Sequence, residues 1–160
     1  MGSRQTKGKV GVGDVAPNFT LTSQSGEGVS LGGFLGRGRA IVLFFYPKDD
    51  TPGCTKEACT FRDEYEQFGS MEAEVIGISS DSVKSHERFV EKHGLPFTLL
   101  SDEGGGVRKI YGVPNTLGLF PGRVTYLIDE EGVVRHHVFS SQLYPTRHVE
   151  QALRALESIN

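Results

Sequence analysis

The stretch that decides the fold begins Ala40-Ile-Val-Leu-Phe-Phe-Tyr46 and continues Pro-Lys-Asp-Asp-Thr-Pro-Gly-Cys54. The first part is a run of β-branched and aromatic side chains, which is typical of a strand buried on both faces. The polar, proline-containing part that follows predicts a loop at the carboxyl end of that strand. Open α/β folds place their ligands at this edge of the sheet. We therefore expect a functional site around Cys54.

A helix is predicted to begin directly after this loop. Thr51 is a good N-cap, Pro52 suits the first helical position, and Glu57 lies near the end of the first turn, where a carboxylate is favoured. Free backbone N–H groups and the helix dipole favour an anion in this turn, so the thiol of Cys54 should ionise more readily than that of a free cysteine. The helix is predicted to end at Gly69. Its apolar stripe, which faces the core, consists of Ala58, Phe61, Tyr65 and Phe68.

The second of the two cysteines, Cys59, lies five positions further along the same helix. Five residues turn a helix by roughly 140° and separate the alpha carbons by about 8–9 Å, beyond the usual disulfide limit of ~7 Å. A disulfide between Cys54 and Cys59 therefore requires the first turns to unwind, which makes the pair a candidate redox switch. Two unrelated cysteines, one buried and one exposed, are the alternative. Zinc is disfavoured because the five histidines show no spacing that completes a ligand set.

Strands and helices alternate along the rest of the chain. This order predicts an α/β sandwich with a mixed sheet, which a thioredoxin-like core fits. We expect residues 1–11 to be a mobile segment and residues 12–160 to form a single domain. Residues 112–122 are predicted to be a loop whose apolar Leu117, Leu119 and Phe120 line a wider pocket. The other predicted strands are 18–22, 29–31, 74–79, 96–101, 123–128 and 133–139, and the other helices are 81–93, 107–111 and 145–159.

Composition excludes several classes of protein. The chain of 160 residues has a net charge of −3, with basic residues spread along it, which argues against a nucleic-acid partner. No run approaches the ~20 apolar residues that a membrane span needs. Two cysteines are too few for a secreted disulfide scaffold, so a reducing compartment is expected. Residues 1–9 are basic without an apolar core, unlike a signal peptide, and fit either an added segment or a trimmed mature chain.

The pattern Pro47-x-x-x-Thr51-x-x-Cys54 resembles the active-site motif of the peroxiredoxins. A second cysteine five residues later is similar to the Q-type subgroup, also called bacterioferritin comigratory proteins. The resemblance extends from about Val12 to the end of the chain. It implies a thioredoxin-like fold with an N-terminal β-hairpin and a thiol peroxidase that reduces hydrogen peroxide and organic hydroperoxides. The other segments that resemble the family are 12–19, 74–79, 95–102, 111–114 and 122–129.

The resemblance also implies roles for individual residues. Cleaving a peroxide bond needs a thiolate, hydrogen-bond donors for both oxygens and a nearby cation. Cys54 is the expected nucleophile, and the hydroxyl of Thr51 and the N–H groups of Gly53 and Cys54 face the substrate. Pro47 stiffens the loop and shields the sulfur. Arg123 is expected beside the sulfur, and here the resemblance alone carries the assignment.

Turnover then needs a route back from the sulfenic acid. Cys59 is expected to attack oxidised Cys54, and thioredoxin or a similar dithiol to reduce the resulting disulfide. No flavin, haem or metal is required. The resemblance favours a monomer, in a bacterial cytoplasm or a plastid. Two alternatives are a general thiol–disulfide oxidoreductase, which should carry Cys-x-x-Cys, and a redox sensor or holdase without enzymatic turnover.

The remaining charged clusters are expected to have no part in the chemistry. The pairs Asp49-Asp50 and Glu130-Glu131 are predicted to be solvated turn residues. Adjacent residues of a strand point to opposite faces, so His136 and His137 cannot easily share a metal ion. Structural or surface roles are predicted for the other three histidines: His86, His93 and His148.

Overall fold

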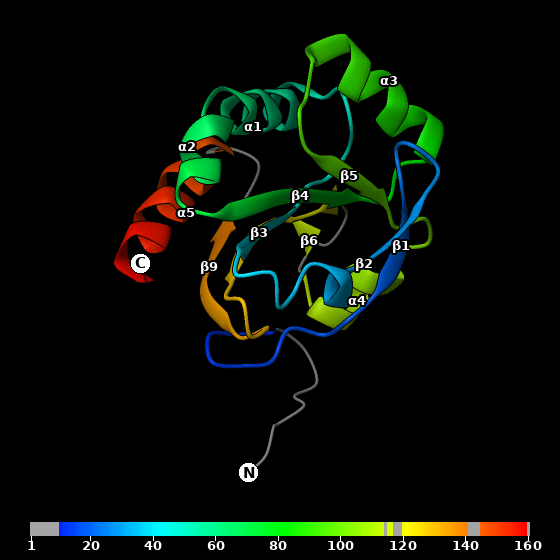
Figure 1. Ribbon diagram of the computed structural model, residues 1–160. Coiled ribbons are helices and arrows are strands. Elements are labelled where there is room, and N and C mark those ends of the chain that lie inside the picture. The colour runs from blue at the N-terminus through cyan, green and yellow to red at the C-terminus, as the bar shows by residue number, and fades with distance from the viewer. Residues whose placement is uncertain (1–9, 114, 117–119, 141–144, 160) are drawn as a thin grey trace.

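The computed structural model describes residues 10–113, 115–116, 120–140 and 145–159 (Figure 1). Of the segment predicted to be mobile, residues 1–9 lie outside this part. Val10 is buried and its amide donates a hydrogen bond to the Tyr111 carbonyl at 3.0 Å. Leu117, Leu119 and the side chain of Phe120, predicted to line a pocket, lie outside the described residues.

Seven strands form one mixed sheet in the order β2-β1-β5-β4-β3-β8-β9. The neighbours β3, β4 and β5 run parallel, and the remaining pairs are antiparallel. A separate pair, β6 and β7, lies within the segment predicted to be a loop. The strands are β1 Thr20–Ser23, β2 Gly28–Ser30, β3 Ala40–Phe45, β4 Ala73–Ser79, β5 Thr98–Ser101, β6 Asn115–Thr116, β7 Phe120–Pro121, β8 Arg123–Ile128 and β9 Val134–Ser140.

Helices cover both faces of this sheet (Figure 1). One face packs against α1, α2, α3 and α5, and the other against α4 and the short 3₁₀ helix η1. The predicted α/β sandwich with a mixed sheet is thereby confirmed. No helix in the described part of the chain is long and apolar enough to cross a membrane. The helices are η1 Leu31–Gly33, α1 Pro52–Asp63, α2 Tyr65–Ser70, α3 Val83–His93, α4 Gly106–Tyr111 and α5 Pro145–Ile159.

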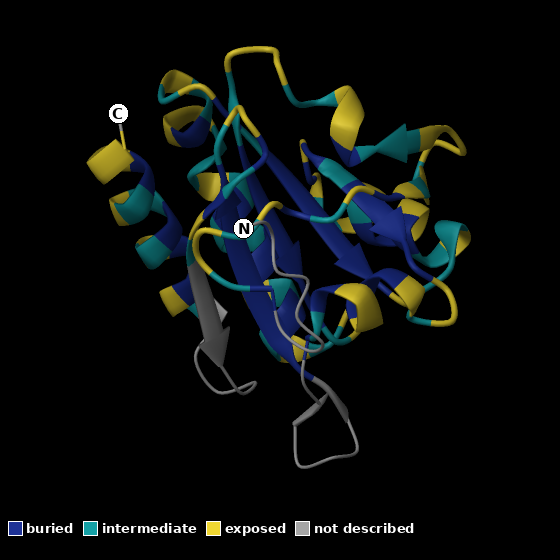
Figure 2. Cartoon of the chain, turned by 90° about the horizontal axis from the view of Figure 1, so that it is seen from below, coloured by how far each residue is buried: buried dark blue, intermediate teal, exposed yellow. Residues whose placement is uncertain are grey.

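Strand β3 lies at the centre of the core, as its apolar run predicts. Alternate side chains, Ile41, Leu43 and Phe45, enter the core on the α4 side, and those between them, together with Tyr46, enter the core under α1. Figure 2 shows the buried sheet at the centre, with the exposed residues on the surrounding helices and loops. Burying such side chains stabilises the fold by about 1.5–3 kcal/mol each. The carboxyl end of β3 is thus a rigid support for the loop that follows.

The helix after β3 differs from the prediction. One helix was expected to continue to Phe68, but α1 ends at Asp63 and α2 begins at Tyr65, with Glu64 between them at φ −100° and ψ 9°. Gly69 lies inside α2 instead of ending the helix. Core packing accounts for the break, because it brings the rings of Phe61 and Phe68 to 5.6 Å within one hydrophobic cluster.

Candidate active site

Cys54 occupies the first turn of α1, just beyond the end of β3, and is 2% exposed. The first intrahelical bond is donated by the Thr55 amide to the Thr51 carbonyl at 2.8 Å. The N–H groups of Gly53 and Cys54 precede it and therefore have no acceptor within the helix. Such groups, at the positive end of the helix dipole, favour an anion. The backbone around Cys54 is thus arranged to stabilise negative charge.

Thr51 lies at the N-cap position, but its side chain does not cap the helix. Its hydroxyl donates to the Lys48 carbonyl at 2.8 Å, so the predicted capping role of the side chain is wrong. The hydroxyl has one proton, and because Lys48 accepts it, the Thr51 oxygen remains an acceptor for an incoming group. Pro47 and Gly53 are half-buried on either side of this residue.

Arg123 is the first residue of β8 and is 1% exposed. The antiparallel register pairs Phe45 with Val124, which brings Arg123 to the end of β3 where the active-site loop begins. Its Nη2 donates to the Cys54 sulfur at 3.6 Å. The structure therefore brings together the cysteine and the arginine that the resemblance pointed to.

Glu57 is a member of the site whose role the sequence did not reveal. It lies one turn after Cys54 on α1, is fully buried, and accepts a hydrogen bond from Arg123 Nη1 at 2.5 Å. Burial raises the pKa of Glu57 to about 7, although the charge and hydrogen bond of Arg123 act in the opposite direction. Burial lowers the pKa of Arg123, but the charges of Glu57 and Cys54 outweigh that effect and raise it. Arg123 therefore stays protonated.

His148, on α5, contacts Thr125 and lies near Glu57. Its Nδ1 is 2.7 Å from Thr125 Oγ1 and 3.8 Å from Glu57 Oε2. Burial and the charge of Arg123 lower the pKa of His148 to about 3, so the ring is neutral at pH 7. No sequence spacing connects this histidine to Glu57. The Cys54 cluster is defined as Cys54, Glu57, Arg123, Thr125 and His148.

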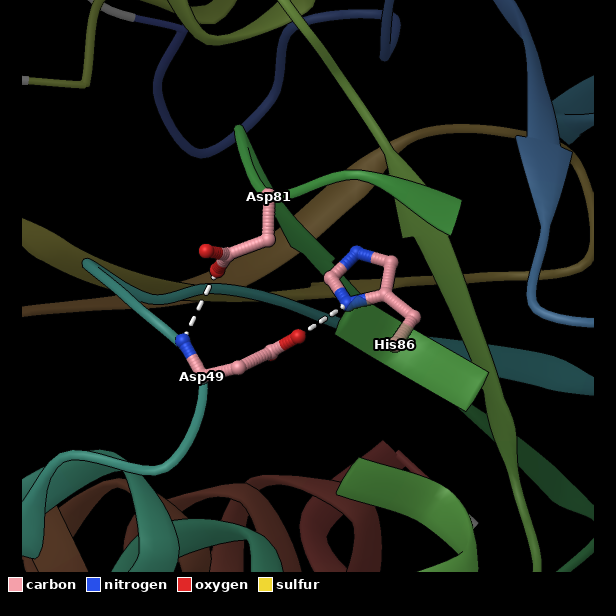
Figure 3. A group of neighbouring side chains, drawn as sticks. All are labelled: Asp49, Asp81 and His86. Atoms are coloured by element: carbon pink, nitrogen blue, oxygen red, sulfur yellow. Dashed lines mark hydrogen bonds and ion pairs between the residues drawn. The ribbon is translucent and has the colours of Figure 1, made fainter. Parts of the chain in front are cut away.

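A second buried cluster lies on the other side of the loop and centres on Asp49 (Figure 3). Tyr46 Oη donates to Asp49 Oδ1 at 2.6 Å, and burial together with the Asp49 charge raises the pKa of Tyr46, so the phenol keeps its proton. Ser85 Oγ donates to Oδ2 at 2.8 Å, and His86 Nδ1 lies 2.7 Å from the same oxygen. Figure 3 also shows the Asp81 carboxylate accepting from the Asp49 amide, at 2.8 Å. The Asp49 cluster is defined as these five residues.

This cluster corrects one prediction. Asp49 is 7% exposed and is not a solvated turn residue, whereas Asp50 is exposed and pairs with Lys92 at 2.9 Å. Three members of the cluster have ligand atoms within 4.8 Å of one another, as in a metal site: Asp49, Asp81 and His86. Both oxygens of Asp49, one oxygen of Asp81 and both ring nitrogens of His86 already contact protein groups. His86 Nε2, for example, donates to the Leu100 carbonyl at 2.9 Å. The arrangement suits an anchor that holds the loop.

Cys59 is half-exposed, and its thiol and that of Cys54 are both free. Helix α1 is continuous between them. Ideal helix geometry then places their alpha carbons about 8–9 Å apart, beyond the limit of ~7 Å for a disulfide. Joining the two sulfurs would require the first turns of α1 to unwind.

Comparisons with known proteins agree with this geometry. The model of the AhpC/TSA family matches residues 12–137. Rice peroxiredoxin Q, a chloroplastic protein of Oryza sativa subsp. japonica, is 54% identical over 153 residues, covering 95% of this chain and 69% of its own. The Arabidopsis thaliana protein of the same name is 51% identical over 151 residues, covering 94% and 68%.

Solved structures show the same likeness. The peroxidoxin BcpB of Mycobacterium tuberculosis superposes with a TM-score of 0.86 at 37% identity, covering 94% of this chain and 98% of its own. The peroxiredoxin Q of Xanthomonas campestris gives 0.78 at 32% identity, covering 88% and 90%.

A buried cysteine at a helix start, beside an arginine on a thioredoxin-like fold, is what a thiol-dependent peroxidase requires. The chain belongs to the AhpC/TSA family. Within that family it is of the peroxiredoxin Q type, a thiol peroxidase that protects against peroxides with electrons from a thiol reductant.

Proposed function

We propose that Cys54 is the nucleophile of the peroxidase reaction. Its thiolate attacks one oxygen of the hydroperoxide, the O–O bond breaks, and the sulfur becomes a sulfenic acid while hydroxide or an alkoxide leaves and takes a proton. The observation that carries this assignment is the 3.6 Å contact between Arg123 Nη2 and the Cys54 sulfur at the start of a helix. Both the cation and the helix terminus stabilise a thiolate there.

The hydroperoxide is proposed to bind across the loop formed by Pro47, Thr51 and Gly53. The free N–H groups of Gly53 and Cys54 would donate hydrogen bonds to the peroxide oxygens. Thr51 Oγ1 would accept a hydrogen bond from the O–H group of the peroxide. Hydrogen peroxide and organic hydroperoxides are the proposed substrates. In support, the bacterioferritin comigratory protein of Xanthomonas campestris, which is 31% identical to this chain, has alkyl peroxide reduction activity.

Cys59 is proposed to resolve the sulfenic acid. Once the first turns of α1 unwind, its thiol attacks the oxidised sulfur of Cys54, a disulfide forms and water leaves. Two electrons from a dithiol, for which we propose thioredoxin, then restore both thiols. The half-exposed position of Cys59 supports this order of events, because the reductant must reach the disulfide.

We further propose that residues 12–160 act as one domain and as a monomer. The compartment proposed is the plastid, since the curated relatives are named chloroplastic. A chloroplast thioredoxin would be the matching reductant.

A coupled assay tests this function directly. NADPH oxidation is followed with thioredoxin, its reductase and a panel of peroxides. Cys54→Ser should abolish the reaction, and Cys59→Ser should complete one turnover and then stop as the sulfenic acid. Fast insulin reduction with little peroxide consumption would instead favour a general oxidoreductase. Stoichiometric oxidation without turnover would favour a redox sensor.

A further inference from the structure

We propose that Arg108 is a positioning residue for the peroxide reaction: its guanidinium holds together the two backbone segments that carry Pro47 and Arg123 and adds a second cation to the site. The inference rests on the proposed role of Cys54 as nucleophile. It adds a residue that neither the motif nor the direct contacts of the sulfur reveal.

The contacts of Arg108 link both sides of the site. It belongs to α4, on the opposite face of the sheet from α1, and is 8% exposed. Its Nη2 donates to the Tyr46 carbonyl at 3.0 Å, and its Nη1 donates to the Gly122 carbonyl at 3.3 Å. The first carbonyl belongs to the peptide bond that leads into Pro47, and the second to the one that leads into Arg123. One planar fork therefore fixes the distance between the active-site loop and the start of β8.

The guanidinium of Arg108 has no carboxylate within ion-pair distance in the described part of the chain. The carboxylate of Asp102 acts on Arg108 through its charge, but its two oxygens accept from the Val107 amide at 3.0 Å and the Arg108 amide at 2.9 Å at the start of α4. No carboxylate oxygen of the described residues lies within 4.0 Å of the guanidinium, and Arg108 Nε is buried without a hydrogen-bond partner among them. Arg108 is a buried cation bound mainly to backbone carbonyls, an expensive arrangement that a nearby anion would offset.

The other arginine of the site is in the opposite situation. Arg123 touches the sulfur, but its charge is paired with buried Glu57, so the two are neutral together when Glu57 is ionised. Arg108 is a second cation whose charge acts on both Asp102 and Cys54. Burial lowers the pKa of Arg108, and the charges of Asp102 and Cys54 oppose that effect. Arg123 orients the reacting groups, while Arg108 adds positive charge and sets the spacing of the two backbone segments.

Two substitutions separate these contributions, and a third is the control. Arg108→Met removes the charge and the fork, Arg108→Lys keeps only the charge, and Lys109→Met removes an exposed charge at the next position of α4. Reduced protein is mixed with hydrogen peroxide without a reductant, and oxidation of Cys54 is followed by rapid-quench mass spectrometry. The rate of Cys54 alkylation by iodoacetamide is measured against pH on the same samples, and thermal unfolding reports how much protein is folded.

Arg108→Met should slow peroxide oxidation by about 10- to 100-fold, the scale of loss that a small misplacement of reacting groups produces. Its alkylation profile should move to higher pH, because the thiolate has lost a cation. Arg108→Lys should restore the alkylation profile but not the full peroxide rate, since an ammonium group cannot hold both carbonyls in a plane. Lys109→Met should match the wild type in both measurements.

An Arg108→Met protein with the wild-type peroxide rate and alkylation profile would overturn the inference, even if it melted earlier, because the role would then be structural only. If that variant does not fold, Arg108→Lys decides. A wild-type peroxide rate in Arg108→Lys would show that the two hydrogen bonds of the guanidinium to the backbone carbonyls do not position the site. The same experiment distinguishes a failure of the proposed function. In that case hydrogen peroxide would leave Cys54 unoxidised in the wild-type protein as well.

Discussion

Two buried polar clusters flank the loop between β3 and α1, and only one of them touches the sulfur. In the Asp49 cluster both carboxylate oxygens of Asp49 and both ring nitrogens of His86 have hydrogen-bond partners. In the Cys54 cluster, Glu57 Oε2 and Arg123 Nε are buried without a hydrogen-bond partner among the described residues. Leaving such a group unsatisfied costs about 1–3 kcal/mol. The paired groups of the Asp49 cluster hold the loop, whereas the cluster beside the sulfur keeps buried polar groups without a hydrogen-bond partner.

This difference in hydrogen bonding indicates that the Asp49 cluster anchors the loop and that the Cys54 cluster takes part in the reaction. Removing a member of the Asp49 cluster should reduce stability more than reactivity, and removing a member of the Cys54 cluster should reduce reactivity first. Three substitutions test that division, in order of decreasing effect on the reaction.

The largest effect is expected for Arg123→Met. Losing one preorganised donor at a site of developing charge slows a reaction by about 10²–10³-fold, so the peroxide rate of Cys54 should fall by that factor. Because this change leaves the Glu57 carboxylate buried and unpaired, the double variant Arg123→Met/Glu57→Gln is the matched control for stability. Rapid-quench mass spectrometry of reduced protein gives the rate. A value within a few-fold of the wild type would remove Arg123 from the reaction.

Asp49→Asn should act mainly on stability. The change leaves Ser85 Oγ and His86 Nδ1 without the carboxylate oxygen that both contact, and leaving a buried polar group unsatisfied costs about 1–3 kcal/mol. Urea unfolding measures the loss, and the peroxide rate per folded molecule should fall far less than for Arg123→Met. The adjacent Asp50→Asn is the control, because Asp50 is exposed and its unfolding midpoint should not change measurably. Equal midpoints for the two variants would show that the Asp49 cluster does not anchor the loop.

The smallest effect is a pH dependence that belongs to Glu57. Burial raises its pKa in the folded protein to about 7 from an ordinary value of 4.5, so folding binds a proton between these values. Stability from this group is greatest at low pH and is lost as the pH rises from 4.5 through 7. Urea midpoints of wild type and Glu57→Gln should therefore diverge across that window, with the wild type losing more. Parallel curves would show that the folded protein does not raise this pKa.

Local pattern was enough to predict most elements of the fold. The apolar run 40–46 corresponds to β3, the strand 123–128 is found with the same bounds as β8, and α5 matches the predicted helix. Ser82 and Gly94 bound α3 as their cap chemistry predicts. The break at Glu64 could not be predicted, because it depends on how Phe61 and Phe68 pack in the core, which the spacing of apolar residues does not show.

The site was predictable only in part. The helix start and the two cysteines mark it directly, but contact between Cys54 and Arg123 joins residues 69 positions apart and followed only from the resemblance. Asp49 was misread because two adjacent aspartates are typical of a solvated turn. Its burial depends on Ser85 and His86 of α3, and a single sequence does not show that this helix packs against the loop.

The most direct test of the account is the mass of the reduced protein after one equivalent of hydrogen peroxide, followed by peptide mapping. We predict a single chain that is lighter by two hydrogen atoms, with Cys54 and Cys59 joined to each other. Two free thiols beside unreacted peroxide, or a disulfide that links two chains, would contradict it.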